Sequence, residues 1–370
     1  MIDSVTLNQL LSLAIEIQQI PAPTFSEDKR GKFIVQKFIN EGLVDTLIDQ
    51  IGNVYARFPG TNNSRPIVLT AHMDTVFPLE TDLHINQTKD RIAGPGIGDN
   101  SLGVAGLIGL VWLLKQGYKL SNDLWLVGNV CEEGLGDLRG MKAVVDRFGG
   151  KPKAYLILEG MALGSIYHRG LSVRRYRIQA AGKGGHSWVN FGRPSAIHEM
   201  ARFINRLEEL RPSVSPKASY NVGTIRGGTS VNTIAAEAEI ELDLRSEDGT
   251  VLLELARKVE KFVIDANRLG DDLVKFQFEI IGNRPTGEIP AKHPLVKLAS
   301  AVLEKQGISP HLEIGSTDAN IPLSKGYPAV CIGITNGSGA HTQDEYIETQ
   351  NIQKGITQLL ELVITLDKNM

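Results

Sequence analysis

The chain has 370 residues, of which 42% are hydrophobic and 22% are charged, and its formal net charge is -3 at pH 7. This length and composition predict an ordinary globular protein with a large core and two domains. Because the Lys and Arg residues are scattered along the chain, we expect neither a nucleic-acid partner nor a membrane partner.

The N-terminal segment and the cysteines bear on the cellular compartment. Residues 1–24 lack a basic start, and Asn, Glu and Gln interrupt their apolar residues, so they predict an amphipathic helix and not a signal peptide. No apolar run is expected to span a bilayer. The two cysteines, Cys131 and Cys331, are far apart and give little support to a disulfide. We therefore expect a protein of the reducing cytoplasm.

The first part of the chain alternates strand-like and helix-like segments, which predicts an α/β fold with a largely buried sheet. Between two of these strands, residues 101–117 show helical apolar spacing and end in a glycine, so they predict a crossover helix. Strands are expected at residues 53–58, 66–71, 123–130 and 154–158.

The pattern changes near Gly170, where apolar and polar residues begin to alternate as in strands with one face in water. We predict a compact α+β domain at residues 170–283, inserted into a larger domain made of residues 1–169 and 284–370. The larger domain resumes with a helix from about residue 294 and a strand at 328–334. Two strands and two helices are expected in the insert, at residues 171–182, 235–245, 195–210 and 249–269.

Polar side chains capable of binding a metal follow the hydrophobic strands. Ligands of such sheets lie beyond the carboxyl ends of the strands, so these side chains are expected to converge on one crevice. Carboxylates that converge would repel one another unless cations neutralised them, and mixed nitrogen and oxygen donors suit zinc. The sequence therefore predicts a metal site, and its candidate residues are His72, Asp74, Asp99, Glu132, Glu133, Glu159 and His341.

Other interpretations of these motifs are less favoured. A single histidine at a strand end is usually structural, and adjacent glutamates usually form a solvated face, but here the same pattern recurs at several strand ends. The glycine-rich segment at residues 94–103 lacks the third glycine of a dinucleotide loop and the lysine of a P-loop. The chain contains no G-x-S-x-G and no C-x-x-C, so serine-nucleophile and redox chemistry lack their signatures.

Several motifs together resemble those of the M20 family of zinc exopeptidases and amidohydrolases. They occur in the family's order and spacing over nearly the whole chain, and they are "AHMDTVFP", "GPGIGDNSLGVAG", "CEEGLG", "ILEG", "GKGGHS", "GSTDAN" and "GAHTQDEYI". The resemblance implies a zinc-exopeptidase catalytic domain, with a mixed, mostly parallel sheet flanked by helices, and an inserted α+β lid or dimerisation domain. It also implies two zinc ions per subunit, with cobalt or manganese as substitutes.

The resemblance assigns a metal ligand to each motif. It implies that His72 and Glu159 bind one zinc, that Glu133 and His341 bind the other, and that Asp99 bridges the two. A pair of zinc ions sharing a carboxylate makes bound water acidic and polarises the scissile carbonyl. The peptide bond after the bridging Asp99 is expected to be cis, as it is in relatives.

The resemblance also assigns catalytic and substrate-binding roles. Glu132 is expected to be the general base that takes a proton from water and passes it to the leaving amine, and Asp74 to orient its neighbours. In the insert, His186 resembles the family's oxyanion-stabilising histidine, and we expect it to reach the active site of the other subunit in a homodimer. The residues expected to hold the substrate are Asn232, Arg245, Ser316 and Thr317.

The chain departs from common family patterns in two places. After the bridging aspartate it has Asn100, Ser101 and Leu102 where many relatives have Asp or Met, then Lys and Gly, and Trp188 replaces a small residue. Glu159 is the residue type usual in the family's carboxypeptidases and N-acyl amino acid hydrolases, whereas aminopeptidases usually have Asp.

The sequence thus predicts a zinc-dependent hydrolase of an amide or peptide bond, acting on a small peptide or N-acyl amino acid with a free carboxylate. One alternative is a di- or tripeptide aminopeptidase of the same family. The other is a catalytically silent metal-binding or peptide-binding protein, which the presence of Glu132 disfavours.

Overall fold

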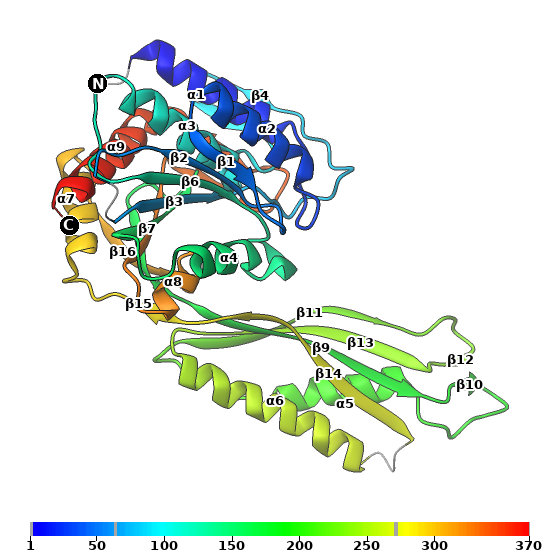
Figure 1. The fold of residues 1–370 in the computed structure, drawn as a ribbon. Helices are drawn as coiled ribbons and strands as arrows, with labels where there is room; N and C mark the ends of the chain where they lie inside the picture. Colours follow the sequence, from blue (N-terminus) through cyan, green and yellow to red (C-terminus); the bar gives the residue numbers. More distant parts are fainter. Residues whose placement is uncertain (1–2, 63–64, 270–272, 370) are drawn as a thin grey trace. The chain divides into compact units, whose positions relative to one another are not determined.

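The computed structural model describes residues 3–62, 65–269 and 273–369, and the chain divides into two compact units (Figure 1). The first unit comprises Met1–Gly170 and Gly287–Met370, and the second comprises Leu171–Thr286. Each unit has its own hydrophobic core, so each is described by itself.

The first unit is built on a nine-stranded mixed sheet with the order β1-β2-β6-β3-β7-β17-β8-β15, in which β16 pairs with β8. Its central strands β6, β3, β7 and β17 are parallel, and the strands toward the edges include antiparallel pairs. The strands are β1 (Val44–Ile48), β2 (Val54–Phe58), β3 (Ile67–His72), β6 (Leu124–Asn129), β7 (Ala154–Glu159), β8 (Ser165–Gly170), β15 (Gly287–Glu288), β16 (His311–Gly315) and β17 (Ala329–Gly333).

Helices cover both faces of this sheet, with α1, α3 and α9 on one face and α4 on the other (Figure 1). The helices are α1 (Ser4–Gln18), α2 (Asp28–Asn40), α3 (Leu102–Leu114), α4 (Arg139–Phe148), α7 (Pro294–Lys305), α8 (Asn320–Ser324) and α9 (Ile352–Asn369). A small sheet of β4 (Asn86–Gln87), β5 (Arg91–Ala93), β18 (Gly337–Ser338) and β19 (Tyr346–Glu348) completes the unit. The predicted α/β class is confirmed.

Helix α3 is the crossover helix predicted from the sequence, and it lies at the centre of the core. With the preceding turn it forms a segment, Ile97–Leu114, that is apolar and long enough to cross a membrane, contrary to the sequence expectation. Burial accounts for its composition, because 89% of the segment is inside the fold. A Cβ at Gly106 would lie 2.5 Å from Ile334 Cδ1 and 2.9 Å from Leu158 Cδ2, so glycine permits this close packing.

The second unit is a four-stranded antiparallel sheet with the order β11-β13-β9-β14. Two helices pack on one face of it (Figure 1), where Tyr176 and Ile178 of β9 are buried together with Met200 and Val259 of the helices. The elements are β9 (Ser172–Gly182), β10 (Gly185–His186), α5 (Ala196–Leu207), β11 (Ala218–Gly227), β12 (Thr233–Ile234), β13 (Glu237–Ser246), α6 (Gly249–Leu269) and β14 (Val274–Arg284).

The prediction of only two strands in the insert was wrong, because β11 and β14 are also strands. Both lie at edges of the sheet, and both contain an irregularity in register, between Val222 and Thr224 and between Ile280 and Gly282. Before these irregularities, apolar and polar residues alternate from Val274 to Ile280 in β14 and from Ala218 to Val222 in β11, so both segments carry a strand pattern that the prediction missed.

Candidate metal centre

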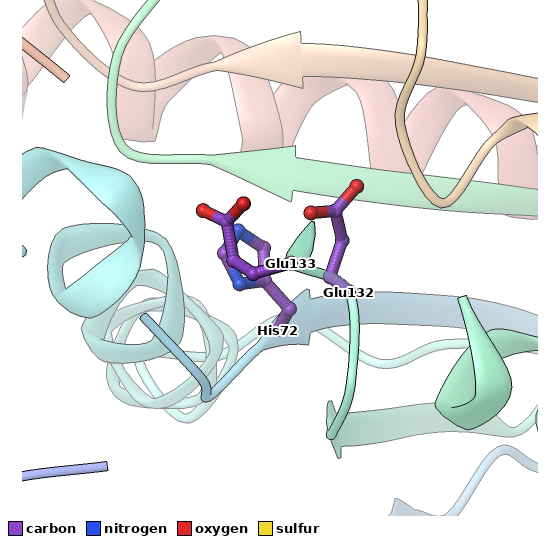
Figure 2. Close-up of side chains that lie close together, drawn as sticks. All are labelled: His72, Glu132 and Glu133. Carbon is purple, nitrogen blue, oxygen red and sulfur yellow. The ribbon is translucent and has the colours of Figure 1, made fainter. Parts of the chain in front are cut away.

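The candidate metal ligands lie at the carboxyl ends of neighbouring strands, as the sequence predicts. His72 is the last residue of β3 and Glu159 the last of β7, while Glu132 and Glu133 follow the end of β6. These three strands are parallel neighbours in the order β6-β3-β7, so their ends meet at one edge of the sheet. Figure 2 shows His72, Glu132 and Glu133 pointing into the same space.

Asp99 lies between two sets of ligands. Its Oδ1 is 3.1 Å from His72 Nε2, which is also 3.5 Å from Glu159 Oε2. Its Oδ2 is 3.1 Å from His341 Nε2, which is also 3.1 Å from Glu133 Oε1. Within each set, the ligand atoms all lie within 4.8 Å of one another. The geometry therefore provides two adjacent sites that share one carboxylate, with the ligand division that the family resemblance implies.

Burial and mutual repulsion shift the acid–base properties of these groups. Burial raises the pKa of Glu133 and of Glu159 to about 7. Hydrogen bonds that His341 donates to the carboxylates of Asp99 and Glu133 raise its pKa to about 10. Burial opposes the charge on His72, but the carboxylates around it outweigh burial and raise its pKa well above its ordinary value. All of these shifts favour positive charge among the carboxylates, which bound cations would also supply.

The donor set fits a pair of divalent metal ions. His72 Nδ1 lies 3.1 Å from the carbonyl oxygen of Asp74, and donation of the Nδ1–H to that oxygen leaves the Nε2 lone pair facing Asp99 and Glu159. Carboxylate oxygens and imidazole nitrogens are donors that zinc accepts. The two neutral imidazoles and three carboxylates together balance most of the charge of two such cations.

Asp74 is a fully buried carboxylate that holds the turn after β6. Its Oδ1 accepts the backbone N–H of Glu132 and its Oδ2 accepts that of Glu133, both at 2.9 Å, and Thr24 Oγ1 donates to Oδ2 at 2.9 Å. The predicted orienting role of Asp74 thus has a physical basis in two backbone hydrogen bonds. Glu132, the predicted base, is buried and forms a third group of possible ligands with His72 and Glu133, but it belongs to neither of the two sets that Asp99 joins.

The departure from the family pattern at Asn100 has a structural explanation. The Asp99–Asn100 peptide bond is cis, as predicted. The Asn100 side chain donates from Nδ2 to the carbonyl oxygen of Leu158 at 2.8 Å, and its Oδ1 accepts the backbone N–H of Gly160 at 2.8 Å. An amide supplies both the donor and the acceptor that these groups need. Asn100 therefore ties the turn that carries Asp99 to the residues on either side of Glu159.

Two buried carboxylates beside the centre were not predicted. Asp318 is fully buried, accepts a hydrogen bond from Asn129 Nδ2 at 2.7 Å, and has its pKa raised by burial and by Glu132. Glu345 is also fully buried and contacts the turn before Asp99. Both lie inside quoted family motifs, "GSTDAN" and "GAHTQDEYI", so position within a motif was the available signal.

The substrate-binding candidates lie in different places. Thr317 Oγ1 accepts the backbone N–H of Ala319, a local turn before α8, and Ser316 precedes it. In the second unit His186 belongs to β10, which pairs with β12, and the backbone N–H of Ser187 donates to the carbonyl oxygen of Asn232 at 3.0 Å. His186 and Asn232 therefore lie side by side on the described part of the insert.

Arg245 lies at the opposite end of the second unit's sheet. Glu237 begins β13 beside Ala181, near the β10–β12 pair, whereas Arg245 pairs with Val173 at the far end of the strand. The eight residue-to-residue steps from Glu237 to Arg245 span roughly 27 Å of extended chain. Its guanidinium Nε donates to Asp243 Oδ1 at 2.7 Å. The structure thus separates Arg245 from His186 within one chain.

A helix-flanked sheet with two adjacent ligand sets sharing an aspartate defines a metal-dependent hydrolase of the two-metal type. Comparison with known proteins agrees with this class. The model of the peptidase family M20/M25/M40 matches residues 68–365, and the chain belongs to this family. It is therefore a metallopeptidase-family hydrolase, as the resemblance implied.

Individual relatives show the range of the family. A probable carboxypeptidase of Aspergillus clavatus is 28% identical over 279 residues, covering 67% of this chain and 65% of that protein. The fold is similar to that of a tripeptidase from Staphylococcus aureus, with a TM-score of 0.81, 22% identity and coverage of 98% and 99% of the two chains. It is also similar to the YxeP protein of Bacillus subtilis, a dinuclear metal binding peptidase, with a TM-score of 0.70, 17% identity and full coverage of both chains.

Proposed function

We propose that the protein is a di-zinc hydrolase that cleaves an amide or peptide bond in a small substrate with a free carboxylate. The reaction is that of a carboxypeptidase or an N-acyl amino acid amidohydrolase. The observation that carries this proposal is the position of Asp99 between two ligand sets, with the buried Glu132 beside them. Glu159, typical of these activities within the family, favours this substrate class over free amino termini.

Glu132 and Asp74 have separate roles in the proposed hydrolysis. When bound, the metal pair supplies Lewis acidity that lowers the pKa of water and polarises the substrate carbonyl. Glu132 takes the proton of the attacking water and returns it to the leaving amine. Asp74 keeps Glu132 in place through the backbone of the turn that carries it. Our proposal that both metals are zinc rests on the donor types, and metal analysis of protein purified without added metal tests it.

His186 is suited to stabilise the oxyanion. Its Nδ1 accepts the backbone N–H groups of Trp188 and Val189, at 3.2 and 3.4 Å. A neutral imidazole that accepts at Nδ1 carries its proton on Nε2, so this nitrogen is a fixed donor. One such donor contributes about 3 to 4 kcal/mol to transition-state stabilisation.

A homodimer accounts for the separation of His186 from Arg245. A small substrate cannot contact two residues that lie roughly 27 Å apart along one sheet. We propose that Arg245 of one chain and His186 of its twin serve the same substrate, with the insert forming the interface. Mixing Glu132→Gln chains with His186→Ala chains tests this, because a mixed dimer then contains one site with both residues intact. Return of activity supports the proposal, whereas inactive heterodimers of demonstrated composition refute it.

A second candidate is a di- or tripeptide aminopeptidase. It is favoured by the ion pair between Arg245 and Asp243, because this guanidinium already has a carboxylate partner. The fold similarity to a tripeptidase is compatible with it. In this case substrates with a free amino terminus are cleaved irrespective of whether the carboxyl end is free.

A substrate panel distinguishes the two functions. Zinc-loaded protein is assayed against N-acyl amino acids, dipeptides and tripeptides, each as the free acid and as the C-terminal amide. We expect hydrolysis of the free acids and little hydrolysis of the amides, and equal rates on both overturn the carboxylate requirement. Glu132→Gln is the matched control, since it keeps size and metal ligands and should lose about two to four orders of magnitude in rate. Absence of activity on the whole panel favours the silent metal-binding protein.

Because both cysteines are free and buried, we further propose that the enzyme works in the cytoplasm.

A further inference from the structure

Glu345 is a buried carboxylate that accepts hydrogen bonds only from backbone groups in the described residues. Its Oε1 accepts the N–H of Gly98 at 2.7 Å and the N–H of Asp99 at 2.8 Å, and its Oε2 accepts the N–H of Gly96 at 3.1 Å. Its own carbonyl oxygen accepts the N–H of Gly94 at 2.8 Å. The side chain is 0% exposed. One residue thus holds the whole turn that leads into Asp99.

The same residue belongs to the loop that carries His341. This loop connects β18 to β19, and within it the N–H of Thr342 donates to the carbonyl oxygen of Gly339 while the N–H of Glu345 donates to that of Thr342. His341 is therefore linked to Glu345 through a short hydrogen-bonded turn. Glu345 joins the two loops that present Asp99 and His341, whose Oδ2 and Nε2 lie 3.1 Å apart.

We propose that Glu345 is a positioning residue that sets the spacing of Asp99 and His341, and thereby the affinity of the metal held by Asp99, Glu133 and His341. This inference rests on the metal roles in the proposed function. The other metal shares Asp99, but its remaining ligands, His72 and Glu159, lie at the ends of strands β3 and β7. Strands of the central sheet hold those two ligands, whereas loops hold His341 and the turn before Asp99.

The carboxylate is specifically suited to this position. Two of the three N–H groups converge on one oxygen, and the third points to the other oxygen. The amide of glutamine has one acceptor oxygen, so its NH₂ group would face an N–H donor. Aspartate keeps both oxygens but is shorter by one methylene, about 1.5 Å. Glu345→Gln therefore removes part of the hydrogen bonding, and Glu345→Asp shifts the carboxylate away from the turn.

The experiment compares metal binding by wild type, Glu345→Gln and Glu345→Asp. Asp344→Asn is the matched control, because it removes an exposed carboxylate from the same loop without touching the turn before Asp99. Each metal-free protein is titrated with Co²⁺, and binding is measured from the heat released and from the visible absorption spectrum of the ion. The number of metal ions bound per chain is then measured after dialysis against a fixed concentration of free metal. We expect the metal held by Asp99, Glu133 and His341 to bind about 10- to 100-fold more weakly, as is typical when a residue supporting a ligand is lost, and the metal held by His72, Asp99 and Glu159 to be affected much less. Asp344→Asn should bind both as wild type does.

Three outcomes separate the alternatives. Unchanged binding of both metals by both variants overturns the positioning role. Equal weakening of both metals, together with a parallel loss of thermal stability, also overturns it and assigns Glu345 a purely structural role. If wild type itself binds no metal pair, the proposed function fails first, and that result is independent of the variants. Should one variant fail to fold, the other still decides between these outcomes.

Discussion

Loading the protein with metal is expected to release protons, and the number follows from the shifted pKa values of the ligands. The pKa of His341 is raised to about 10 and that of His72 well above its ordinary value, so both imidazoles are protonated at pH 7 without metal. The pKa values of Glu133 and Glu159 are about 7, so each holds about half a proton at that pH. Metal ligands must be deprotonated, so loading should release about three protons per chain.

The sign of the pH dependence follows from this competition. Because a raised pKa keeps protons on the metal-free ligands, low pH disfavours the metals and affinity rises as pH increases. Near pH 7 the apparent binding constant for the pair should rise roughly a thousandfold per pH unit. Above the pKa of the two glutamates only the imidazoles still release protons, so the slope falls to roughly a hundredfold per unit. The slope decreases further as pH passes through the pKa of His341, about 10.

Calorimetry measures the released protons directly. Zn²⁺ is titrated into metal-free protein in buffers of different ionisation enthalpy at pH 7, and the dependence of the observed heat on that enthalpy gives the proton number. His341→Gln should release about one proton fewer, because its protonated imidazole is gone. The control His198→Gln removes an exposed histidine of α5 and should change nothing. A heat that is the same in every buffer would refute the assigned protonation states and the ligand set behind them.

Three further predictions concern residues around the centre. Asp74→Ala leaves the two backbone N–H groups of the turn after β6 unpaired and should lower the free energy of unfolding by about 1 to 3 kcal/mol for each N–H group. Chemical denaturation of the metal-free protein measures this, and an unchanged free energy of unfolding would contradict the proposed role of Asp74 in holding the turn. Arg245→Lys should mainly raise the KM for free acids, because lysine cannot pair with a carboxylate in a bidentate way, and steady-state kinetics check this. Trp188 is 86% exposed beside His186, so Trp188→Ala should reduce kcat/KM most for substrates with large apolar side chains; an equal effect on all substrates would exclude a role in selectivity.

The sequence predicted the parts of the site that depend on local chemistry. His72 and Glu159 end strands whose buried apolar residues mark them clearly, and both side chains are of types that bind metals. The edge strands β11 and β14 were missed although apolar and polar residues alternate in them, because strands at the edges of the sheet bury few residues, and β11 buries none. The separation of Arg245 from His186 also could not be predicted, since it depends on the direction of β13 within a sheet whose full strand order was unknown.

The contacts by which Asp74 and Glu345 hold the ligand loops could not be predicted from the sequence, for a physical reason. Asp74 accepts the N–H of Glu132, 58 residues away, and Glu345 accepts the N–H of Asp99, 246 residues away. Their partners are backbone N–H groups, which every residue except proline carries, so the residue type at the other end of the hydrogen bond does not reveal it. A metal ligand can be recognised in the sequence by its residue type. A carboxylate that supports a loop can be recognised only when the fold shows which backbone N–H groups it accepts. Asp74 and Glu345 both bind the backbone of a loop that carries a metal ligand, and they leave the side chain of that ligand free to bind the metal. The geometry of the centre therefore depends on residues outside the ligand set.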